Sequence, residues 1–339
     1  MEREGRFFVG ETEIRCVLCP HCCKIPGGIC GVRGKENGIP FYGHVTALAV
    51  DPIEKKPLFH FRPGTEILSV GFVGCNLSCP FCQNWRISRP RASVPGKRMT
   101  PADIVSATLD RGILAIAYTY SEPLVHAEFL LDCMSLADKQ GIANVLVTNG
   151  CANTEVAEEI LSLTDAANID LKCFSQETYA QTLGGASTKD IFETVLAFIR
   201  LARAKKVHVE ITTLVVPGMN DTLGELDACA DFIASLNAEP DLPEIPWHLS
   251  AYHPSYLWKA PPTDPAFLLR VKERAEKRLR FVYVGNIPGE ENDTRCINCG
   301  ALLVRRLGYV TETGGLAEPE RGEQFFRCAK CGNGTGISC

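Results

Sequence analysis

Short apolar runs alternate with longer stretches of helical periodicity between residues 66 and 288. A short, continuous apolar run is typical of a buried strand, and apolar residues every three or four positions are typical of an amphipathic helix. We therefore expect seven strands, at Ile67–Val73, Ile113–Tyr118, Asn144–Thr148, Asn168–Leu171, Val207–Val215, Trp247–Ala251 and Phe281–Val284.

Helix start signals stand between several of these runs. A capping residue precedes a proline at Thr100–Pro101 and again at Asp264–Pro265, and Asn153 precedes another helical stretch. Regular strand and helix alternation indicates parallel strands joined by right-handed crossovers, with helices outside. We expect an α/β fold, a partial (β/α)6 barrel of TIM type at residues 66–288, with a Cys-rich N-terminal extension (residues 1–65) and a small tail (residues 289–339).

Polar residues able to do chemistry follow the expected strands. Parallel barrels build their sites where the carboxyl ends of the strands meet, so these residues should share one mouth. In chain order they are Cys75, Tyr120, Ser121, Glu122, Thr148, Asn149, Asp170, Lys172, Glu210, Thr212, Tyr252, His253 and Asn286.

The most specific motif follows the first expected strand, in the stretch VGFVGCNLSCPFCQNW. Cys75, Cys79 and Cys82 stand there at C-x-x-x-C-x-x-C spacing. Three thiolates on one loop can hold an iron-sulfur cluster whose fourth iron has no protein ligand, and that open iron can bind a small molecule. The alternative is a zinc site whose fourth ligand comes from elsewhere.

Composition narrows the class of protein. The chain has 339 residues, 17 cysteines and a formal net charge of −5. There is no basic run for nucleic acid, and no apolar stretch approaches the length of a membrane span. We therefore expect a cytoplasmic protein, and in a reducing compartment so many cysteines indicate metal binding rather than disulfides.

The N-terminal extension carries a second cysteine group in RCVLCPHCCKIPGGICGVRG. We select Cys16, Cys19, Cys23 and Cys30 as ligands, although Cys22 or His21 could replace one of them. Such a stretch has too few apolar residues to form its own core, so we expect a bound metal to stabilise its fold. Zinc and a second iron-sulfur cluster both remain possible, and free thiols are the third alternative.

The tail carries a third group. Two C-x-x-C pairs separated by a hairpin-length insert are typical of a zinc-ribbon site, in which four thiolates close a tetrahedron around zinc. A rubredoxin-like iron site is the alternative. The four ligands would be Cys296, Cys299, Cys328 and Cys331, which leaves Cys339 without a role.

The C-x-x-x-C-x-aromatic-C motif, with Phe81 as the aromatic, identifies the chain as a member of the radical S-adenosylmethionine (radical SAM) superfamily. Its central part resembles the activating enzymes of glycyl-radical proteins. CVLCPHCC, YTYSEP, HLSAYHP, YVGNIPG and the cysteine pairs of the tail resemble more closely the radical SAM enzymes of the AmmeMemoRadiSam system.

The resemblance implies a 4Fe-4S cluster on Cys75, Cys79 and Cys82 that binds S-adenosylmethionine and cleaves it to a 5′-deoxyadenosyl radical. That radical would take hydrogen from a substrate, for which a protein or peptide is the expectation. The electron would come from a flavodoxin or ferredoxin, and the other two proteins of the AmmeMemoRadiSam system are candidate partners. The cofactor site would comprise Phe81, Tyr120, Ser121, Glu122, Thr148, Asn149, Asp170, Lys172 and His253.

Two other functions stay open at this point. The enzyme could be a glycyl-radical activase, although its second-strand motif is Tyr-Ser-Glu-Pro where Gly-Gly-Glu-Pro is commoner. From a different class, the protein could be a non-catalytic iron-sulfur electron carrier or a metal-dependent scaffold. A carrier does not need so many polar positions around one cluster, so the sequence favours the enzyme.

Overall fold

The computed structural model describes residues 3–34, 38–89, 94–184, 190–239, 242–289, 291–320 and 322–339. Its centre is an eight-stranded sheet in the order β14-β13-β12-β11-β10-β9-β7-β6. All neighbours pair in parallel except β6, which runs antiparallel to β7. The strands are β6 (Ala47–Pro52), β7 (Glu66–Gly71), β9 (Ala115–Thr119), β10 (Ala143–Thr148), β11 (Ala166–Asp170), β12 (His208–Val215), β13 (Trp247–Ala251) and β14 (Val282–Gly285).

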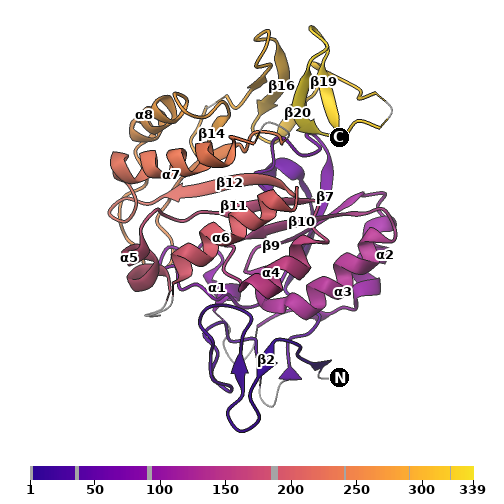
Figure 1. The fold of residues 1–339 in the computed structure, drawn as a ribbon, viewed down its shortest axis with the longest axis vertical. Helices are drawn as coiled ribbons and strands as arrows, with labels where there is room; N and C mark the ends of the chain where they lie inside the picture. The colour runs from indigo at the N-terminus through magenta and orange to yellow at the C-terminus, as the bar shows by residue number, and fades with distance from the viewer. Residues whose placement is uncertain are drawn as a thin grey trace.

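All seven expected strands are confirmed, with their bounds shifted by up to two residues. Six helical connections join these seven parallel strands, so the parallel part of the sheet has one strand more than six βα units supply, and β6 adds an eighth. The longer helices lie on the outside of the sheet (Figure 1). They are α2 (Pro101–Leu109), α3 (Ala127–Asp138), α4 (Thr154–Leu161), α6 (Ile191–Ala204), α7 (Leu223–Leu236) and α8 (Pro265–Ala275), with short α1 (Trp85–Ser88) and α5 (Gln176–Thr178).

A helix begins after each of the three expected start signals, and in two cases a side chain caps it. Thr100 and Asp103 exchange side-chain and backbone hydrogen bonds in a capping box, and Asp264 caps the N–H of Ala266. Asn153 precedes α4 but makes no cap. Its side chain donates instead to the carbonyl of Val17 at 2.8 Å, so it fastens the N-terminal extension to the barrel.

The sheet begins earlier in the chain than residue 66. Strand β6 pairs with β7 along its whole length, from Ala47 opposite Gly71 to Pro52 opposite Glu66. The residues after it, including Ile53, Leu58 and Phe61, pack with β7, β9, β10 and β11 in an apolar cluster. Residues 47–61 are therefore part of the barrel, which the sequence analysis placed in the extension.

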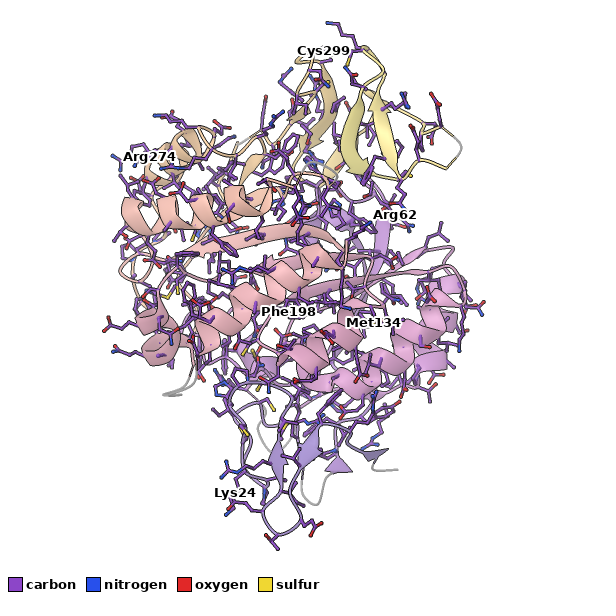
Figure 2. All side chains as sticks on the ribbon, viewed as in Figure 1. Lys24, Arg62, Met134, Phe198, Arg274 and Cys299 are labelled. Carbon is purple, nitrogen blue, oxygen red and sulfur yellow. The ribbon has the colours of Figure 1, made fainter. Side chains whose placement is uncertain are left out.

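The extension and the tail lie at opposite ends of the barrel, as the positions of Lys24 and Cys299 show (Figures 1 and 2). The extension has the short pairs β1–β4 (Arg3–Glu4, Gly38–Ile39) and β2–β3 (Phe8–Val9, Arg15–Cys16), and β5 (His44–Val45) pairs with β8 (Lys97–Arg98). The tail has two three-stranded sheets: β15 (Thr294–Arg295), β16 (Leu302–Leu307) and β17 (Val310–Glu312), then β18 (Leu316–Ala317), β19 (Phe325–Cys328) and β20 (Gly334–Ser338). Among the residues described, no helix is both long and apolar enough to cross a membrane.

A buried polar network fills the amino-terminal end of the barrel, which we call the floor. Glu210 accepts hydrogen bonds from the backbone N–H groups of Phe59 and His60, at 3.0 and 2.7 Å. His208 and His248, at the starts of β12 and β13, contact its two carboxylate oxygens at 3.1 and 2.6 Å. The expectation that Glu210 lies at the mouth is therefore wrong, because it stands near the start of its strand.

The tail is fastened to this floor by Arg306. Its guanidinium donates to the carbonyl of Phe59 at 2.6 Å and to the hydroxyl of Thr294 at 2.7 Å. Tyr283, on β14, contacts both Thr294 and His60 at 2.7 Å. Barrel, floor segment and tail thus share one hydrogen-bond network, and Arg306 is only 2% exposed.

Candidate active site

The cysteine loop leaves β7 at the mouth of the barrel and is fixed by contacts from several other segments. Gly74 has φ +90°, and a β-carbon there would come within 2.6 Å of the carbonyl oxygen of Cys30. His126 contacts the carbonyl of Val73 at 2.7 Å, and Arg89 donates to the carbonyl of Leu77 at 2.6 Å. The backbone that carries the cysteines is therefore held in place by contacts from other segments of the chain.

Cys75, Cys79 and Cys82 line a single cavity of about 320 Å³ at the mouth. Most of the predicted cofactor residues line it with them, so the structure brings those side chains together as expected. These residues are Phe81, Tyr120, Ser121, Glu122, Thr148, Asn149, Asp170 and Lys172.

The three thiols suit a cluster better than a single ion. Burial raises the pKa of Cys75 well above its usual value and that of Cys79 to about 11, so metal binding must supply the energy of deprotonation. Within the described part of the chain, only the tail brings three or more ligand atoms within 4.8 Å of one another. Thiolates bound to different irons of one cluster stay further apart than thiolates on one ion, so the donor set fits an iron-sulfur cluster.

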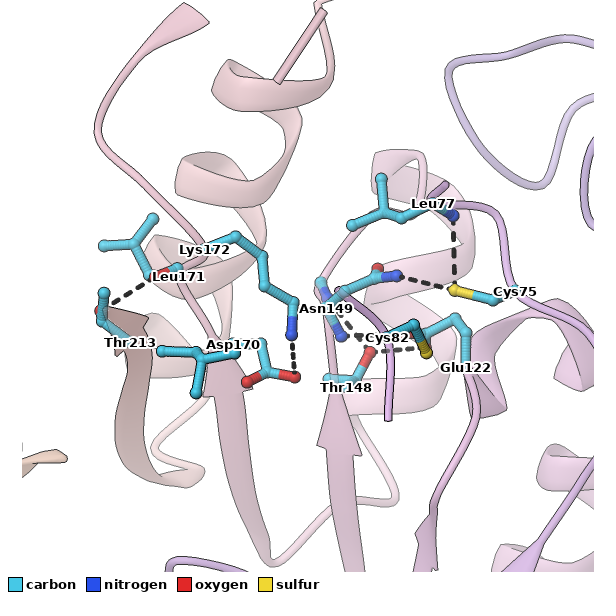
Figure 3. Close-up of polar contacts among 12 residues, drawn as sticks. Cys75, Leu77, Cys82, Glu122, Thr148, Asn149, Asp170, Leu171, Lys172 and Thr213 are labelled. Carbon is cyan, nitrogen blue, oxygen red and sulfur yellow. Dashed lines mark hydrogen bonds and ion pairs between the residues drawn. The ribbon is translucent and has the colours of Figure 1, made fainter. Parts of the chain in front are cut away.

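Glu122 is the most perturbed carboxyl group in this cavity. It caps the short 3-10 helix at Pro123–His126, accepting from the N–H of Leu124 at 3.0 Å. Thr148 donates its hydroxyl at 2.6 Å and Asn149 its backbone N–H at 2.8 Å (Figure 3). Burial raises the pKa of Glu122 to about 7, although these hydrogen bonds favour the ionised form.

Asn149 links this carboxylate to the first cysteine. Its side-chain amide lies 3.7 Å from the sulfur of Cys75 and donates to the side-chain oxygen of Asn76 at 3.0 Å (Figure 3). Asn76 in turn donates to the carbonyl of Cys151 at 2.7 Å. The carboxylate of Glu122 and the thiol of Cys75 are therefore both contacted by Asn149.

Asp170 and Lys172 form an ion pair of 2.7 Å on the other side of the cavity (Figure 3). Burial alone would lower the pKa of Lys172, but Asp170 and Cys79 raise it above its usual value. The ammonium group therefore stays charged beside the cysteine loop, where it can offset the negative charge of thiolates or of a bound carboxylate.

Tyr120 takes the left-handed conformation, φ +69°, that glycine adopts most easily. Its hydroxyl donates to Asp51 at 2.7 Å, and the ammonium of Lys56 lies 4.6 Å from its ring centre. Its carbonyl accepts from the side chain of Asn84 at 2.7 Å. These contacts, together with Ser121 donating to the carbonyl of Phe72 at 2.9 Å, hold the strained backbone.

His253 is the predicted residue that the structure does not bring to the cavity. Its side chain is exposed, and its ring contacts the carbonyl of Asn286 at 3.0 Å. Conversely, several lining residues were not among the residues expected at the mouth: Lys55, Lys56, Gln83, Asn84 and Ser250. The Lys-Lys pair follows the antiparallel strand β6, where a reading of parallel strand ends does not look.

The four tail cysteines form a compact site. All four sulfurs lie within 4.8 Å of one another, and two of the sulfur pairs, Cys296 with Cys331 and Cys299 with Cys328, are 3.7 Å apart. Each C-x-x-C pair ends in a glycine of positive φ, Gly300 or Gly332, whose N–H donates to the carbonyl of the first cysteine. A metal site of four cysteines therefore exists in the tail.

The N-terminal cysteines also gather at one place. Cys16, Cys19, Cys23 and Cys30 line a small cavity, and Cys22 does not. His21 lines it too, and its ring contacts the carbonyl of Asn76 at 2.7 Å. The structure therefore brings the four predicted ligands to one place, and which side chains bind a metal there stays a prediction.

Comparison with known proteins identifies the family. A family model described as the radical SAM superfamily matches residues 69–233. An uncharacterized protein of Methanocaldococcus jannaschii is 39% identical, covering 97% of this chain and 98% of its own. The pyruvate formate-lyase-activating enzyme of Clostridium pasteurianum is 27% identical over 55% of this chain and 76% of its own. The chain belongs to the radical SAM superfamily and is similar to pyruvate formate-lyase-activating enzymes.

Among solved structures, a radical SAM methyltransferase from Sphaerobacter thermophilus shares the fold, with a TM-score of 0.50 and 14% identity. The match covers 66% of this chain and 67% of that one. It supports the partial-barrel architecture. Members of the superfamily are enzymes that use a 4Fe-4S cluster, S-adenosylmethionine and a reductant, so the electron carrier and scaffold alternatives are not favoured.

Proposed function

We propose that the protein cleaves S-adenosylmethionine reductively and uses the resulting radical to take hydrogen from a protein or peptide. The supporting observation is that Cys75, Cys79 and Cys82 share one cavity with Glu122 and Lys172. The three cysteines would hold a 4Fe-4S cluster and leave one iron free for the cofactor. When bound, the cluster supplies one electron that breaks a carbon–sulfur bond of the sulfonium, giving methionine and a 5′-deoxyadenosyl radical.

In this proposal the protein's side chains bind and orient S-adenosylmethionine. Glu122 presents carboxylate oxygens from a rigid cap, so it can accept from the ammonium group of the cofactor's methionine part. Lys172 carries a positive charge beside the cysteine loop and can contact the methionine carboxylate. Phe81 and Leu77 are buried lining residues that exclude water from the reacting atoms.

The external electron donor in this proposal is a flavodoxin or a ferredoxin. A glycyl-radical activase is the second candidate, favoured by the similarity to pyruvate formate-lyase-activating enzymes. The other two AmmeMemoRadiSam proteins are the proposed partners. None of the 17 cysteines is in a disulfide, which supports a reducing, cytoplasmic setting.

The test is cofactor cleavage after anaerobic reconstitution. Reduced wild-type protein should convert S-adenosylmethionine to 5′-deoxyadenosine and methionine, and Cys79→Ala should not. Cys133→Ala is the matched control, because Cys133 is buried in α3 and does not line the cavity. The proposal fails if wild-type protein with a full, reduced cluster and bound cofactor forms no deoxyadenosine even with cell extract added.

We further propose that the tail holds zinc. A tetrahedral zinc with Zn–S bonds of about 2.3 Å places its sulfurs about 3.8 Å apart, and two tail pairs stand at 3.7 Å. Metal analysis of the purified chain should find one tightly held zinc that is lost in Cys331→Ala and kept in Cys339→Ala. Iron at this site instead of zinc would favour the rubredoxin-like alternative.

A further inference from the structure

The cavity in the N-terminal extension is a second place where four thiols converge. Three of its cysteines, Cys16, Cys19 and Cys30, are less than 9% exposed. The fourth, Cys23, is partly exposed. Cysteines gathered at one cavity in this way are typical ligands of a metal ion or a cluster.

The spacing of these sulfurs separates them from the tail site. In the tail, the four sulfurs lie within 4.8 Å of one another, as the ligands of a single ion do. Of all the residues whose positions are described, no other set of three or more ligand atoms meets that limit. The N-terminal sulfurs therefore stand further apart around their cavity, as do Cys75, Cys79 and Cys82 around theirs. This is the arrangement expected when each thiolate binds a different iron.

A buried cation provides an independent observation. Arg33 lines the N-terminal cavity and is only 5% exposed. Its terminal nitrogens bind Glu128 at 2.6 and 2.9 Å, and its guanidinium also interacts with the side chain of Cys16. A buried guanidinium beside Cys16 can donate to a thiolate ligand or to a sulfide of a cluster in this cavity.

The cavity also lies directly behind the active site. Asn76 lines the N-terminal cavity and follows Cys75 in the chain. Its carbonyl contacts His21 at 2.7 Å from the N-terminal side, while its side chain accepts from Asn149 at 3.0 Å on the active-site side. One residue of the cysteine loop therefore faces both sets of thiols.

We propose that Cys16, Cys19, Cys23 and Cys30 bind a second four-iron iron-sulfur cluster, not zinc, immediately behind the loop that carries Cys75. All four irons have a cysteine ligand, so this cluster has no open iron for S-adenosylmethionine. Arg33 is a positioning residue that donates toward it. The inference does not depend on the proposed reaction, because it concerns only which metal these four cysteines hold.

The experiment uses the full chain with Cys75, Cys79 and Cys82 all changed to alanine. This triple variant leaves the N-terminal cysteines intact, and after anaerobic reconstitution it should retain about four iron and four sulfide per chain, half of the wild-type content. Adding Cys30→Ala should remove that iron. Adding Cys22→Ala, the matched control beside Cys23 but outside the cavity, should leave it in place.

Zinc analysis and spectroscopy decide among the outcomes. One zinc per chain, the tail's, is expected in every variant, and its retention reports that the Cys30→Ala chain is still folded. Two zinc and no iron in the triple variant would overturn the proposal in favour of an N-terminal zinc, and one zinc with no iron would overturn it in favour of free thiols. In wild-type protein, S-adenosylmethionine should shift only one of two reduced-cluster electron paramagnetic resonance signals; a shift of all the iron signal would also overturn it.

Discussion

Glu122 at the mouth of the barrel and Glu210 at its floor are both almost completely buried, 2% and 0% exposed, but their surroundings act in opposite directions. Burial raises the pKa of both, and at Glu122 it prevails, since the partners are a hydroxyl and backbone N–H groups. At Glu210 the histidines His208 and His248 outweigh burial and lower the pKa well below its usual value. The floor is arranged to stabilise its carboxylate, whereas the mouth keeps its carboxylate at an energetic cost that a bound cation can relieve.

The largest expected effect is on stability at the floor. Glu210→Ala leaves two backbone N–H groups and two histidines without their acceptor, and breaking such a buried charged network costs about 3–5 kcal/mol. Thermal unfolding of the anaerobic protein at pH 7 measures this, with the exposed Glu273→Ala as control. If the Glu210→Ala protein is as stable as the control, the hydrogen-bond network at the floor does not stabilise the fold, and the contrast with the mouth is wrong.

The corresponding change at the mouth should affect catalysis more than stability. Glu122→Gln keeps the shape but removes the carboxylate, and misplacing the cofactor can cost on the order of a hundredfold in rate. Deoxyadenosine formation should fall by that order with normal iron content. The unfolding temperature should fall less than in Glu210→Ala, because the Gln amide leaves only one side of the hydrogen-bond set without an acceptor. Thr148→Ser retains the hydroxyl that binds Glu122, so it should keep most of the activity. Equal activity in Glu122→Gln and wild type would contradict the assignment.

A third prediction concerns the stability of the folded protein at low pH. Burial lowers the pKa of His60 to about 3, and Glu210, Arg306, His208 and His248 surround it. The unfolded chain takes up this proton at about pH 6.5, whereas the folded chain does not, so stability should fall as the pH drops from about 6.5 toward 3. Glu210 acts in the same direction below about pH 4.5. In His60→Asn, unfolding temperatures should fall less between pH 6.5 and 4.5; an unchanged slope would rule out His60 as the source.

The smallest expected effect is that of His253→Ala. The side chain is exposed and outside the cavity, so cofactor cleavage should change by less than about twofold, the range expected of a surface substitution. Lys172→Met is the comparison, because Lys172 lines the cavity and pairs with Asp170. If His253→Ala is as impaired as Lys172→Met, the loop after β13 must close over the cofactor during the reaction.

The apolar pattern predicts the seven parallel strands well, because each is buried on both faces and therefore continuous in sequence. It misses β6, whose Leu48 and Val50 are partly exposed and alternate with less exposed residues. That pattern is typical of an edge strand, and it lies before the first parallel strand, where the sequence reading placed only the Cys-rich extension.

At the site, the sequence predicts which polar residues lie on or after the strands. It does not predict their position along the barrel axis, at the mouth or at the floor. Glu210 and Thr212 point to the same side of β12, since strand side chains alternate, yet Thr212 lines the mouth cavity and Glu210 belongs to the floor. The direction of His253 depends on the loop beyond β13, which has no periodicity. Cysteine spacing gave the three thiol groups, but only their distances distinguish one-ion from cluster geometry.

Strand β6 also determines where this protein can be shortened. It covers the outer edge of β7, whose residues from Ile67 to Gly71 are buried. A chain cut at residue 66 would keep every cysteine of the motif after β7, yet it would expose an apolar strand edge able to pair with other molecules. It would also lose Ile53, Leu58 and Phe61 from the floor. The shortest fragment that keeps the barrel intact therefore starts before Ala47, and shorter fragments should aggregate.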